Sequence, residues 1–270
     1  MSAQTWKTHW ATIDQARDPQ RYVGQMSAMR KEADDTVPGP FLEFCDLQVG
    51  QRVLDVGSGP GWHVRAASRV VGPTGRAVGV DLSEAMVAEA RQQAAERGVD
   101  VDFVQGSAYA LPFEDNTFDR CFSIGMTDIL DDPVQAVREM VRVTRPGGLI
   151  CQYVCESDAT YIIPAGAPMT RRLLDFFREY ELSHPSGIEV VSVLKSLGTT
   201  IEQLDGVIDH KEDFAFVKSL FFDDWLTDAV AADVLTSEEA QQWLADQEAH
   251  ASEGKFVLGM PNYLIKATKK

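Results

Sequence analysis

The middle of the chain alternates between short apolar runs and segments of helical periodicity. The apolar runs predict strands, and apolar positions that recur every three or four residues predict the helices between them. The predicted strands are 51–57, 77–81, 101–105, 118–124 and 148–155, and the predicted helices are 61–71, 84–97 and 133–144. Because crossovers of this kind are right-handed, we expect an α/β fold with a doubly wound, mostly parallel sheet that binds ligands at the carboxyl ends of its strands.

Local signals indicate where several of these helices begin and end. Ser83 can cap the helix that follows it, and Asp132 stands before a proline at a favoured helix start. Residues 145–148 (Arg-Pro-Gly-Gly) are expected to stop the third helix and turn the chain into the next strand. Residues 236–239 have the spacing of a capping box, which predicts a further helix near the end of the chain.

The regions on either side of this alternation are less regular. Residues 1–44 have helical spacing broken by Pro38-Gly39-Pro40, and they precede the first strand, where a segment can fold over the carboxyl edge of the sheet. After Cys155 we predict a helix at 168–182, a second at 188–197, a strand near 199–205, acidic aromatic helices to 250 and a terminal strand at 256–267. We predict a single domain over 1–270, composed of a cap (1–44), a core (45–155), an insertion (156–187) and a carboxyl-terminal part with the last two strands (188–270).

A glycine-rich turn follows the first predicted strand. Asp55 ends the apolar run, and Gly57, Gly59 and Gly61 follow at alternate positions. Three glycines allow a sharp turn and a close approach of a ligand to the backbone, and the helix that follows offers amide donors. The spacing differs from the dinucleotide fingerprint G-x-G-x-x-G, because Trp62 stands where its last glycine would be.

The turn and three later segments resemble, in order, the signatures of class I S-adenosylmethionine-dependent methyltransferases. The later segments are 77–81 ending at Asp81, 106–113 followed by Phe118-Asp119, and 143–148. The chain is similar to the small-molecule, ubiquinone/menaquinone-biosynthesis-like branch, methyltransferase type 11. This resemblance implies S-adenosyl-L-methionine as cofactor, a seven-stranded Rossmann-like sheet with helical cap and lid insertions, and a lid at 156–187. It covers about 51–155 strongly and the remainder only in general layout.

The resemblance also implies which residues bind the cofactor. Asp81 would accept hydrogen bonds from both ribose hydroxyls, and Asp55 would order the loop and the cofactor amine. Where many relatives have aspartate after the glycine of the third motif, this chain has Ser107, whose hydroxyl can still accept a bond from the adenine amine. The predicted cofactor-binding residues are Asp55, Gly57, Gly59, Gly61, Asp81, Leu82, Ser107 and Ala108.

No catalytic residue is assigned from the sequence. Relatives often place histidines after the fourth strand, whereas here residues 124–128 are Ile-Gly-Met-Thr-Asp. Methyl transfer is an in-line displacement at an activated carbon, so alignment and exclusion of water can supply much of the acceleration. Candidates for a base are Tyr22, His63, Asp128 and His184, and for each a packing or surface role is the more common one.

The composition of the chain argues against several classes of binding partner. The net charge of −16, from 25 basic and 41 acidic residues, opposes binding to nucleic acid. No apolar stretch approaches the length of a membrane helix, so we expect no membrane partner and a cytoplasmic protein. The four cysteines lie in or beside apolar segments, which favours buried thiols over disulfides or a metal site. The sequence leaves the oligomeric state open.

The sequence therefore predicts a methyltransferase that acts on an oxygen, nitrogen or carbon of a small organic metabolite, in secondary metabolism or quinone-like biosynthesis. Aromatic residues of the cap and insertion, including Tyr22, Tyr161, Phe176 and Phe177, suit a largely apolar acceptor. Two alternatives stay open at this point: an NAD-dependent oxidoreductase, and a non-catalytic partner protein that retains a nucleotide pocket.

Overall fold

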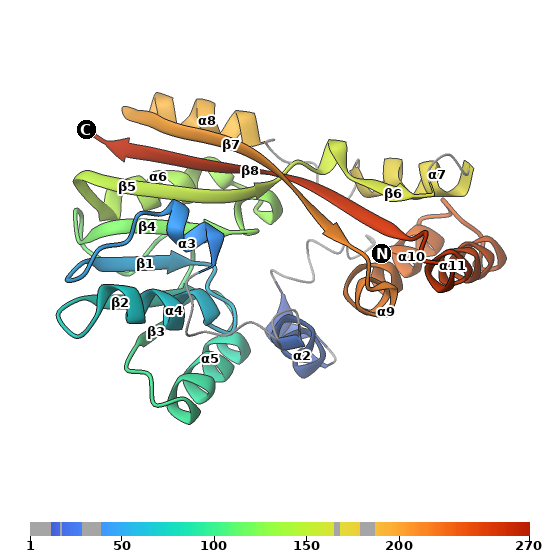
Figure 1. Cartoon of the computed structure of the whole chain (residues 1–270), viewed down its shortest axis with the longest axis horizontal. Helices are drawn as coiled ribbons and strands as arrows, with labels where there is room; N and C mark the ends of the chain where they lie inside the picture. Colours follow the sequence, from blue (N-terminus) through green and yellow to red (C-terminus); the bar gives the residue numbers. More distant parts are fainter. Residues whose placement is uncertain (1–11, 17, 29–38, 165–167, 179–186) are drawn as a thin grey trace. The chain divides into compact units, whose positions relative to one another are not determined.

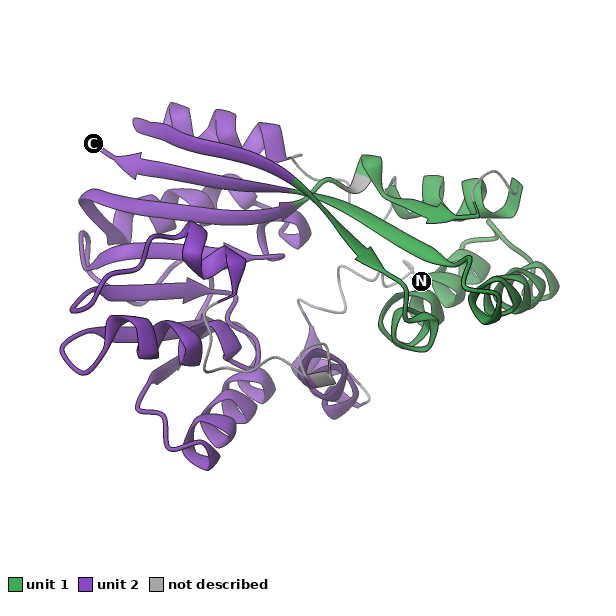
Figure 2. Ribbon diagram, in the orientation of Figure 1, with its two compact units in different colours: residues 1–10, 155–183, 207–262 green, residues 11–154, 184–206, 263–270 purple. Residues whose placement is uncertain are grey.

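The computed structural model describes residues 12–16, 18–28, 39–164, 168–178 and 187–270 (Figure 1). The chain forms two compact units, coloured separately in Figure 2. Unit 1 comprises residues 1–10, 155–183 and 207–262, and unit 2 comprises residues 11–154, 184–206 and 263–270. The long strands β7 (Thr199–Lys211) and β8 (Val257–Lys269) belong to both units, and Figure 1 draws them running in opposite directions.

Unit 2 is built on the predicted parallel strands. β1 pairs in parallel with β2 and with β4, β2 pairs with β3, and β4 pairs with β5. The strands of the unit are β1 (Arg52–Val56), β2 (Arg76–Asp81), β3 (Asp102–Gln105), β4 (Phe118–Ile124) and β5 (Thr144–Cys155), joined by parts of β7 and β8. Its helices are η1 (Ile13–Gln15), α2 (Pro19–Ala28), α3 (Pro40–Phe44), α4 (Trp62–Val71), α5 (Glu84–Glu96), η2 (Thr127–Ile129), α6 (Pro133–Val143) and α8 (Gly187–Ser196).

Among the described residues the sheet has eight strands, in the order β3-β2-β1-β4-β5-β8-β6 with β7 also paired to β8. The seven predicted strands are all present. The eighth, β6 (Tyr161–Ile163), is three residues long and pairs antiparallel with β8. A doubly wound, mostly parallel sheet is thus confirmed, with one short strand added.

Alternate residues of the strands pack into two separate hydrophobic cores. Leu54 and Val56 of β1 contribute to the core that includes residues of α6 and α8. Val53 of the same strand contributes to the core that includes residues of α3, α4 and α5. Because successive side chains of a strand point to opposite faces, the two clusters show that helices cover both faces of the sheet.

The predicted helix starts at Ser83, Asp132 and Thr236 are confirmed. The side chain of each accepts a hydrogen bond from a backbone amide in the first turn of its helix, and Thr236 forms a complete capping box with Glu239. The predicted turn at 145–148 is different, because these residues lie inside β5. Phe118 pairs with Thr144 and Arg120 with Leu149, so the extra residues of β5 form a bulge and strand pairing begins before them.

Unit 1 has a core of aromatic side chains. Trp225 lies with its ring centroid 3.7 Å from that of Phe177, and Phe222 packs edge-on against Trp243 and Phe256. Phe177, named above among the aromatic residues that suit an apolar acceptor, therefore packs inside unit 1. Besides β6 and parts of β7 and β8, the unit contains η3 (Ser157–Ala159), α7 (Pro168–Phe176), α9 (Phe214–Val217), the π-helical turn η5 (Lys218–Phe222), α10 (Asp223–Ala231) and α11 (Ser237–Ser252).

The predicted helix at 168–182 begins where expected and its α-helical part ends at Phe176; residues 179–186 lie outside the described part of the chain. The described residues of the proposed insertion, up to 178, belong to unit 1. The partition of a single domain into cap, core, insertion and carboxyl-terminal part stays a prediction. In the part of the chain that the structure describes, no helix combines the length and apolarity needed to cross a bilayer.

Candidate functional site

The glycine-rich turn between β1 and α4 is held by the protein's own hydrogen bonds. The amides of Gly57 and Ser58 both donate to the carbonyl of Val80, at 2.8 and 3.0 Å, and the amide of Gly61 donates to the carbonyl of Ser58 at 3.0 Å. These three amides donate to the protein itself. The amide donors expected at the start of α4 are a different set, and their role stays a prediction. What the turn offers a ligand is close access to its backbone.

The three glycines all have positive φ angles, but they face different surroundings. A Cβ atom at Gly61 would lie 2.3 Å from Phe103 Cζ and 3.1 Å from Ala90 Cβ, and one at Gly57 would lie 2.9 Å from Met126 Cγ. At Gly59 the nearest atom would be Met26 Cε, at 3.8 Å. Packing therefore requires glycine at positions 57 and 61, whereas Gly59 leaves open space beside the backbone.

Asp81 stands at the carboxyl end of β2 and is joined directly to the turn. Its Oδ2 atom accepts a hydrogen bond from Gly59 N at 2.8 Å, and its Oδ1 atom accepts one from Ser83 N at 2.9 Å. Burial raises the pKa of Asp81 above its ordinary value, although these amide bonds act in the opposite direction. The nearby carboxylate of Asp14 raises the pKa further. Each carboxylate oxygen has a second lone pair with which to accept a bond from a ligand hydroxyl.

The turn after β3 reaches the same edge of the sheet. Gly106 N donates to the backbone carbonyl of Asp81 at 2.9 Å, and Ser107 Oγ accepts a bond from Tyr109 N at 3.2 Å. Leu82, the residue after Asp81, is 52% exposed. Leu82 thus provides apolar surface next to Asp81, and Ala108 is partly buried against the core that includes Val80. Their contact with an adenine stays a prediction.

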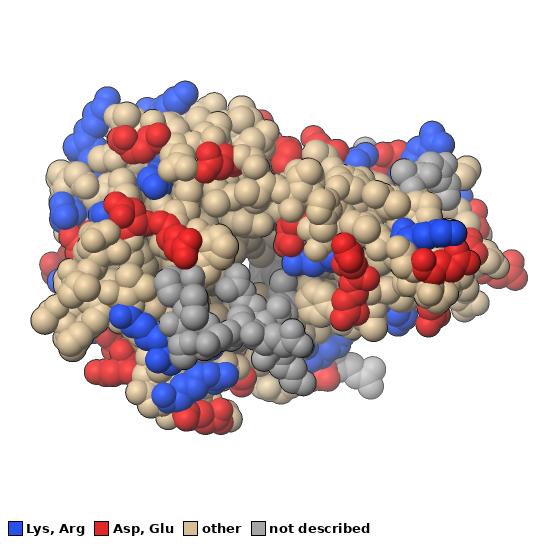
Figure 3. All heavy atoms as spheres, in the orientation of Figure 1, with Lys and Arg blue, Asp and Glu red and all other residues tan. Residues whose placement is uncertain are grey.

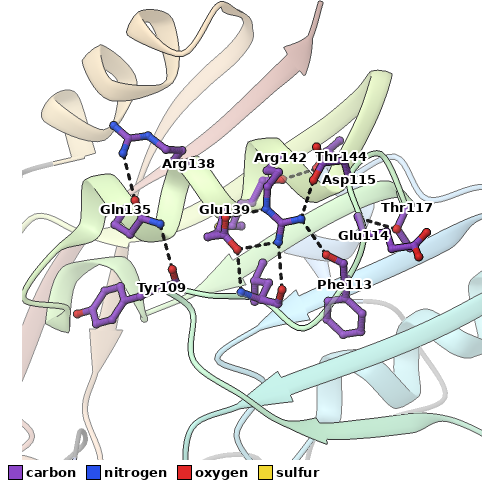
Figure 4. Close-up of polar contacts among 12 residues, drawn as sticks. Tyr109, Phe113, Glu114, Asp115, Thr117, Gln135, Arg138, Glu139, Arg142 and Thr144 are labelled. Atoms are coloured by element: carbon purple, nitrogen blue, oxygen red, sulfur yellow. Dashed lines mark hydrogen bonds and ion pairs between the residues drawn. The ribbon is translucent and has the colours of Figure 1, made fainter.

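Two residues of α6, Glu139 and Arg142, form a clamp on residues 111–115, the segment that follows Ser107 and Ala108 (Figure 4). Glu139 Oε2 accepts a bond from Leu111 N at 2.8 Å, and Arg142 forms two bonds of 2.7 Å with the two oxygens of Glu139. Arg142 also donates to the carbonyl of Phe113 and to Asp115, both at 2.8 Å. The hydrogen bonds with Arg142 hold the pKa of Glu139 below its ordinary value, so the carboxylate stays charged at neutral pH.

The segment before α2 docks at the start of α5. Asp14 accepts hydrogen bonds from Ser83 Oγ and Glu84 N, both at 2.7 Å, and from Ala85 N at 3.1 Å. Burial of Asp14 raises its pKa, but these three bonds outweigh it and the pKa is lowered. A carboxylate at a helix N-terminus is stabilised by the helix dipole. Asp14 therefore anchors the amino-terminal segment two residues beyond Asp81.

The loop after β4 contacts the glycine turn at Gly57. Met126 packs where Gly57 lacks a side chain. The next residue, Thr127, donates to Gln152 Oε1 at 2.5 Å, and Ser123 donates to the same oxygen at 3.3 Å; all three side chains are fully buried. This polar group fixes the loop to β4 and β5. The loop after β4 and the end of β2 thus both contact the glycine turn that follows β1, and the turn after β3 contacts the end of β2.

The predicted site residues divide into two groups. Asp55 is buried near the end of β1, and together with the turn, Asp81, Leu82, Ser107 and Ala108 it belongs to unit 2. The structure leaves the weaker candidates for a base untested. Tyr22 is buried in α2 with the guanidinium of Arg21 5.6 Å from its ring centre, His63 is half-buried in the first turn of α4, Asp128 is buried in η2, and His184 lies outside the described residues.

With this geometry established, comparison with known proteins identifies the domain. Residues 54–152 match the family described as methyltransferase domain. The core of unit 2 is a class I methyltransferase domain. The cofactor of this domain class is S-adenosylmethionine, and the motif order and strand order agree with the assignment.

Relatives of the methyltransferase domain include enzymes of quinone biosynthesis. The chain is 40% identical over 111 residues to the ubiquinone/menaquinone biosynthesis C-methyltransferase UbiE of Ectopseudomonas oleovorans. The aligned residues cover 40% of this chain and 64% of that protein. The chain is also 40% identical over 125 residues to the demethylmenaquinone methyltransferase of Shouchella clausii, covering 46% of this chain and 52% of that protein. The matched region spans less than two thirds of either relative.

Solved structures share the fold over most of the chain. A geranyl diphosphate methyltransferase in complex with S-adenosylmethionine aligns over 92% of this chain and 90% of its own, with a TM-score of 0.56 and 15% identity. The [4+2]-cyclase SpnF aligns over 98% of this chain and 96% of its own, with a TM-score of 0.58 and 20% identity. At these identities the likeness shows the fold alone.

The residues of the methyltransferase domain fit its cofactor. A side chain at Gly59 would occupy the open space next to Asp81, and Asp81 keeps acceptor capacity on both oxygens. Several supporting residues were not found by sequence reasoning: Asp14, Met26, Arg65 and Met126. Each contacts a partner from a distant segment, and no local sequence pattern marks such a contact.

Proposed function

We propose that the chain transfers the methyl group of S-adenosylmethionine to an oxygen, nitrogen or carbon atom of a small organic acceptor. The observation that carries this proposal is the open position at Gly59, joined to the acidic strand end at Asp81 within a methyltransferase domain. The substitution of Trp62 for the last glycine of the dinucleotide fingerprint disfavours the NAD-dependent alternative.

Each site residue has a proposed role in binding. Asp81 accepts bonds from the ribose hydroxyls, Gly59 lets the cofactor approach the backbone, and Asp55 orders the loop. Leu82 and Ala108 pack against the adenine, and Ser107 accepts a bond from its amine. When bound, the cofactor supplies a methyl group activated by its sulfonium. The chain then contributes alignment of the acceptor and exclusion of water.

The acceptor is proposed to be a small, largely apolar metabolite. Acidic and basic side chains are interspersed on the face drawn in Figure 3, and a net charge of −16 opposes binding of nucleic acid. One relative is a ubiquinone/menaquinone biosynthesis C-methyltransferase and the other a demethylmenaquinone methyltransferase, so quinone precursors are the first acceptors to test. A lid formed by residues 156–187 and a cytoplasmic location are further parts of the proposal.

Calorimetry tests the cofactor assignment. We expect S-adenosylhomocysteine and S-adenosylmethionine to bind the protein and NADH to bind weakly or not at all. Tight NADH binding without the other two would overturn the proposal.

Methyl transfer itself needs a separate experiment, because a cyclase shares this fold and fold does not imply reaction. The protein is incubated with cofactor labelled in its methyl group, together with a metabolite extract that includes quinone precursors or with a protein lysate. Mass spectrometry should find the label in one metabolite. Label only in macromolecules would contradict the small-molecule assignment, and binding without any transfer would favour a non-catalytic or different role.

A further inference from the structure

A buried arginine links the glycine turn to the rest of unit 2. Arg65 lies on α4 with no exposed surface. Its Nη1 atom donates to the carbonyl of Pro60, in the turn itself, at 2.6 Å, and its Nη2 atom donates to Gln93 Oε1 on α5 at 3.0 Å. A buried cation of this kind is costly unless its hydrogen bonds are made. Its contacts therefore fix the turn relative to α5.

Gln93, which accepts the bond from Arg65, is also hydrogen-bonded to Ser27 of α2. Its Nε2 atom donates to Glu89 Oε1 at 2.6 Å and to Ser27 Oγ at 3.3 Å, and Ser27 Oγ lies 3.4 Å from Glu89 Oε1. An amide side chain suits this place, because its oxygen faces the arginine while its nitrogen faces the glutamate and the serine. Ser27 is in the last turn of α2, beside Met26, whose Cε atom borders the open space at Gly59.

We infer that Arg65 and Gln93 are positioning residues that couple occupancy of the glycine turn to the docking of α2. This inference rests on the proposed function, since it takes S-adenosylmethionine as the ligand of the turn. The path runs from the Pro60 carbonyl through Arg65 and Gln93 to Ser27, and every step is a hydrogen bond within unit 2. Asp14 holds the other end of the same segment at α5. A ligand beside Gly59 contacts the turn and Met26 at once, so it orders both ends of the path.

The decisive variant is Gln93→Met, which keeps the length of the side chain and removes both ends of the connection. Its matched control is Gln92→Met on the same helix, because Gln92 donates to Glu96 at 2.9 Å on the exposed side. The Gln92 side chain makes no hydrogen bond to the described residues of α2 or of the turn. A second pair tests the α2 end alone: Ser27→Ala removes the hydroxyl, and Ser27→Thr retains it.

The measurements are calorimetry with S-adenosylhomocysteine and hydrogen exchange of residues 19–28 with and without this ligand. In the wild type, in Gln92→Met and in Ser27→Thr, ligand binding should slow exchange in α2. In Gln93→Met and Ser27→Ala the added protection should be lost, and in Gln93→Met affinity should fall about 3- to 10-fold, the loss expected for one ordinary hydrogen bond. A purely structural role would lower the unfolding midpoint and leave the ligand-dependent protection intact.

The inference is overturned if folded Gln93→Met retains both wild-type affinity and ligand-dependent protection of α2. Failure of the proposed function has a different signature. If the wild type does not bind S-adenosylhomocysteine, the cofactor assignment fails, and the connection is then judged on the ligand-free proteins. Faster exchange of α2 in Gln93→Met and Ser27→Ala than in their controls would show that the connection exists, and equal rates would refute it.

Discussion

The glycines of the turn between β1 and α4 have different structural roles, although they are the same residue type. Gly59 and Gly61 both have left-handed backbones, but only Gly61 is enclosed by Phe103 and Ala90. The sequence pattern predicts a ligand-binding role for all three glycines alike. It could not separate them, because the atoms that surround Gly61 come from β3 and α5, which lie far away along the chain.

Substituting alanine at each of the two positions should separate packing from binding. Both Gly59→Ala and Gly61→Ala carry the cost of a left-handed alanine, so the difference between them isolates packing. We expect Gly61→Ala to be less stable than Gly59→Ala by about 1–3 kcal/mol, the usual cost of overpacking. Gly59→Ala should instead lose affinity for S-adenosylhomocysteine. Urea unfolding and calorimetry measure the two effects, and equal stabilities would contradict the packing argument.

If Asp81 binds the ribose hydroxyls, substituting it by asparagine should greatly weaken cofactor binding. Asp81→Asn keeps the side-chain size but replaces one acceptor oxygen by a donor amide. Two charge-assisted bonds at about 1.5–3 kcal/mol each imply a loss of about one to three orders of magnitude in affinity for S-adenosylhomocysteine. Because Asp81 also accepts bonds from Gly59 and Ser83, urea unfolding of the variant must accompany calorimetry. Near-unchanged binding by a folded variant would refute the assignment.

At the scale of elements, helix starts were predicted more accurately than strand ends. Ser83, Asp132 and Thr236 cap the helices expected of them, because a cap is decided by residues within one turn. Strand β5 begins four residues before the predicted start, and β7 extends to Lys211, six residues beyond the predicted end. Strand ends depend on the partner strand, and here the pairing of Phe118 with Thr144 brings a turn sequence into the sheet.

The clamp between α6 and the segment after β3 should depend on pH. The folded-state pKa of Glu139 lies below its unfolded value of about 4.3, so its contribution is present above that pH and is lost as pH falls through the folded pKa. Glu139→Gln should lower the free energy of unfolding at pH 7 by about 1.5–3 kcal/mol, the range for bonds to charged groups.

Urea unfolding at pH 7 and at about pH 3.5 checks this expectation, and the difference between the wild type and Glu139→Gln should shrink at the lower pH. Glu114→Gln, which removes the same charge from an exposed position of the neighbouring segment, is the control and should change stability little. An equal loss at both pH values would show that the clamp acts through shape rather than charge.

At the scale of the whole molecule, the alternation of strands and helices predicted the methyltransferase core but not the division into two units. Unit 1 is formed by residues 155–183 and 207–262, together with the first ten residues. Its aromatic core joins Phe177 to Trp225 and Phe222 to Trp243, across segments that carry no common motif. Such a core is set by long-range packing, whereas the glycine turn and its acidic partner are recognisable from local spacing.

The four buried cysteines, none of which forms a disulfide, can report how often different parts of the fold open. Cys45, Cys121 and Cys151 lie in unit 2, and Cys155 begins a segment of unit 1. Burial raises the pKa of the Cys45 and Cys121 thiols, so the reactive thiolate is suppressed as well as shielded. An alkylating reagent would consequently label each cysteine at the rate at which its surroundings open. Peptide mapping of the label over time would then rank local opening around each thiol without any engineered probe.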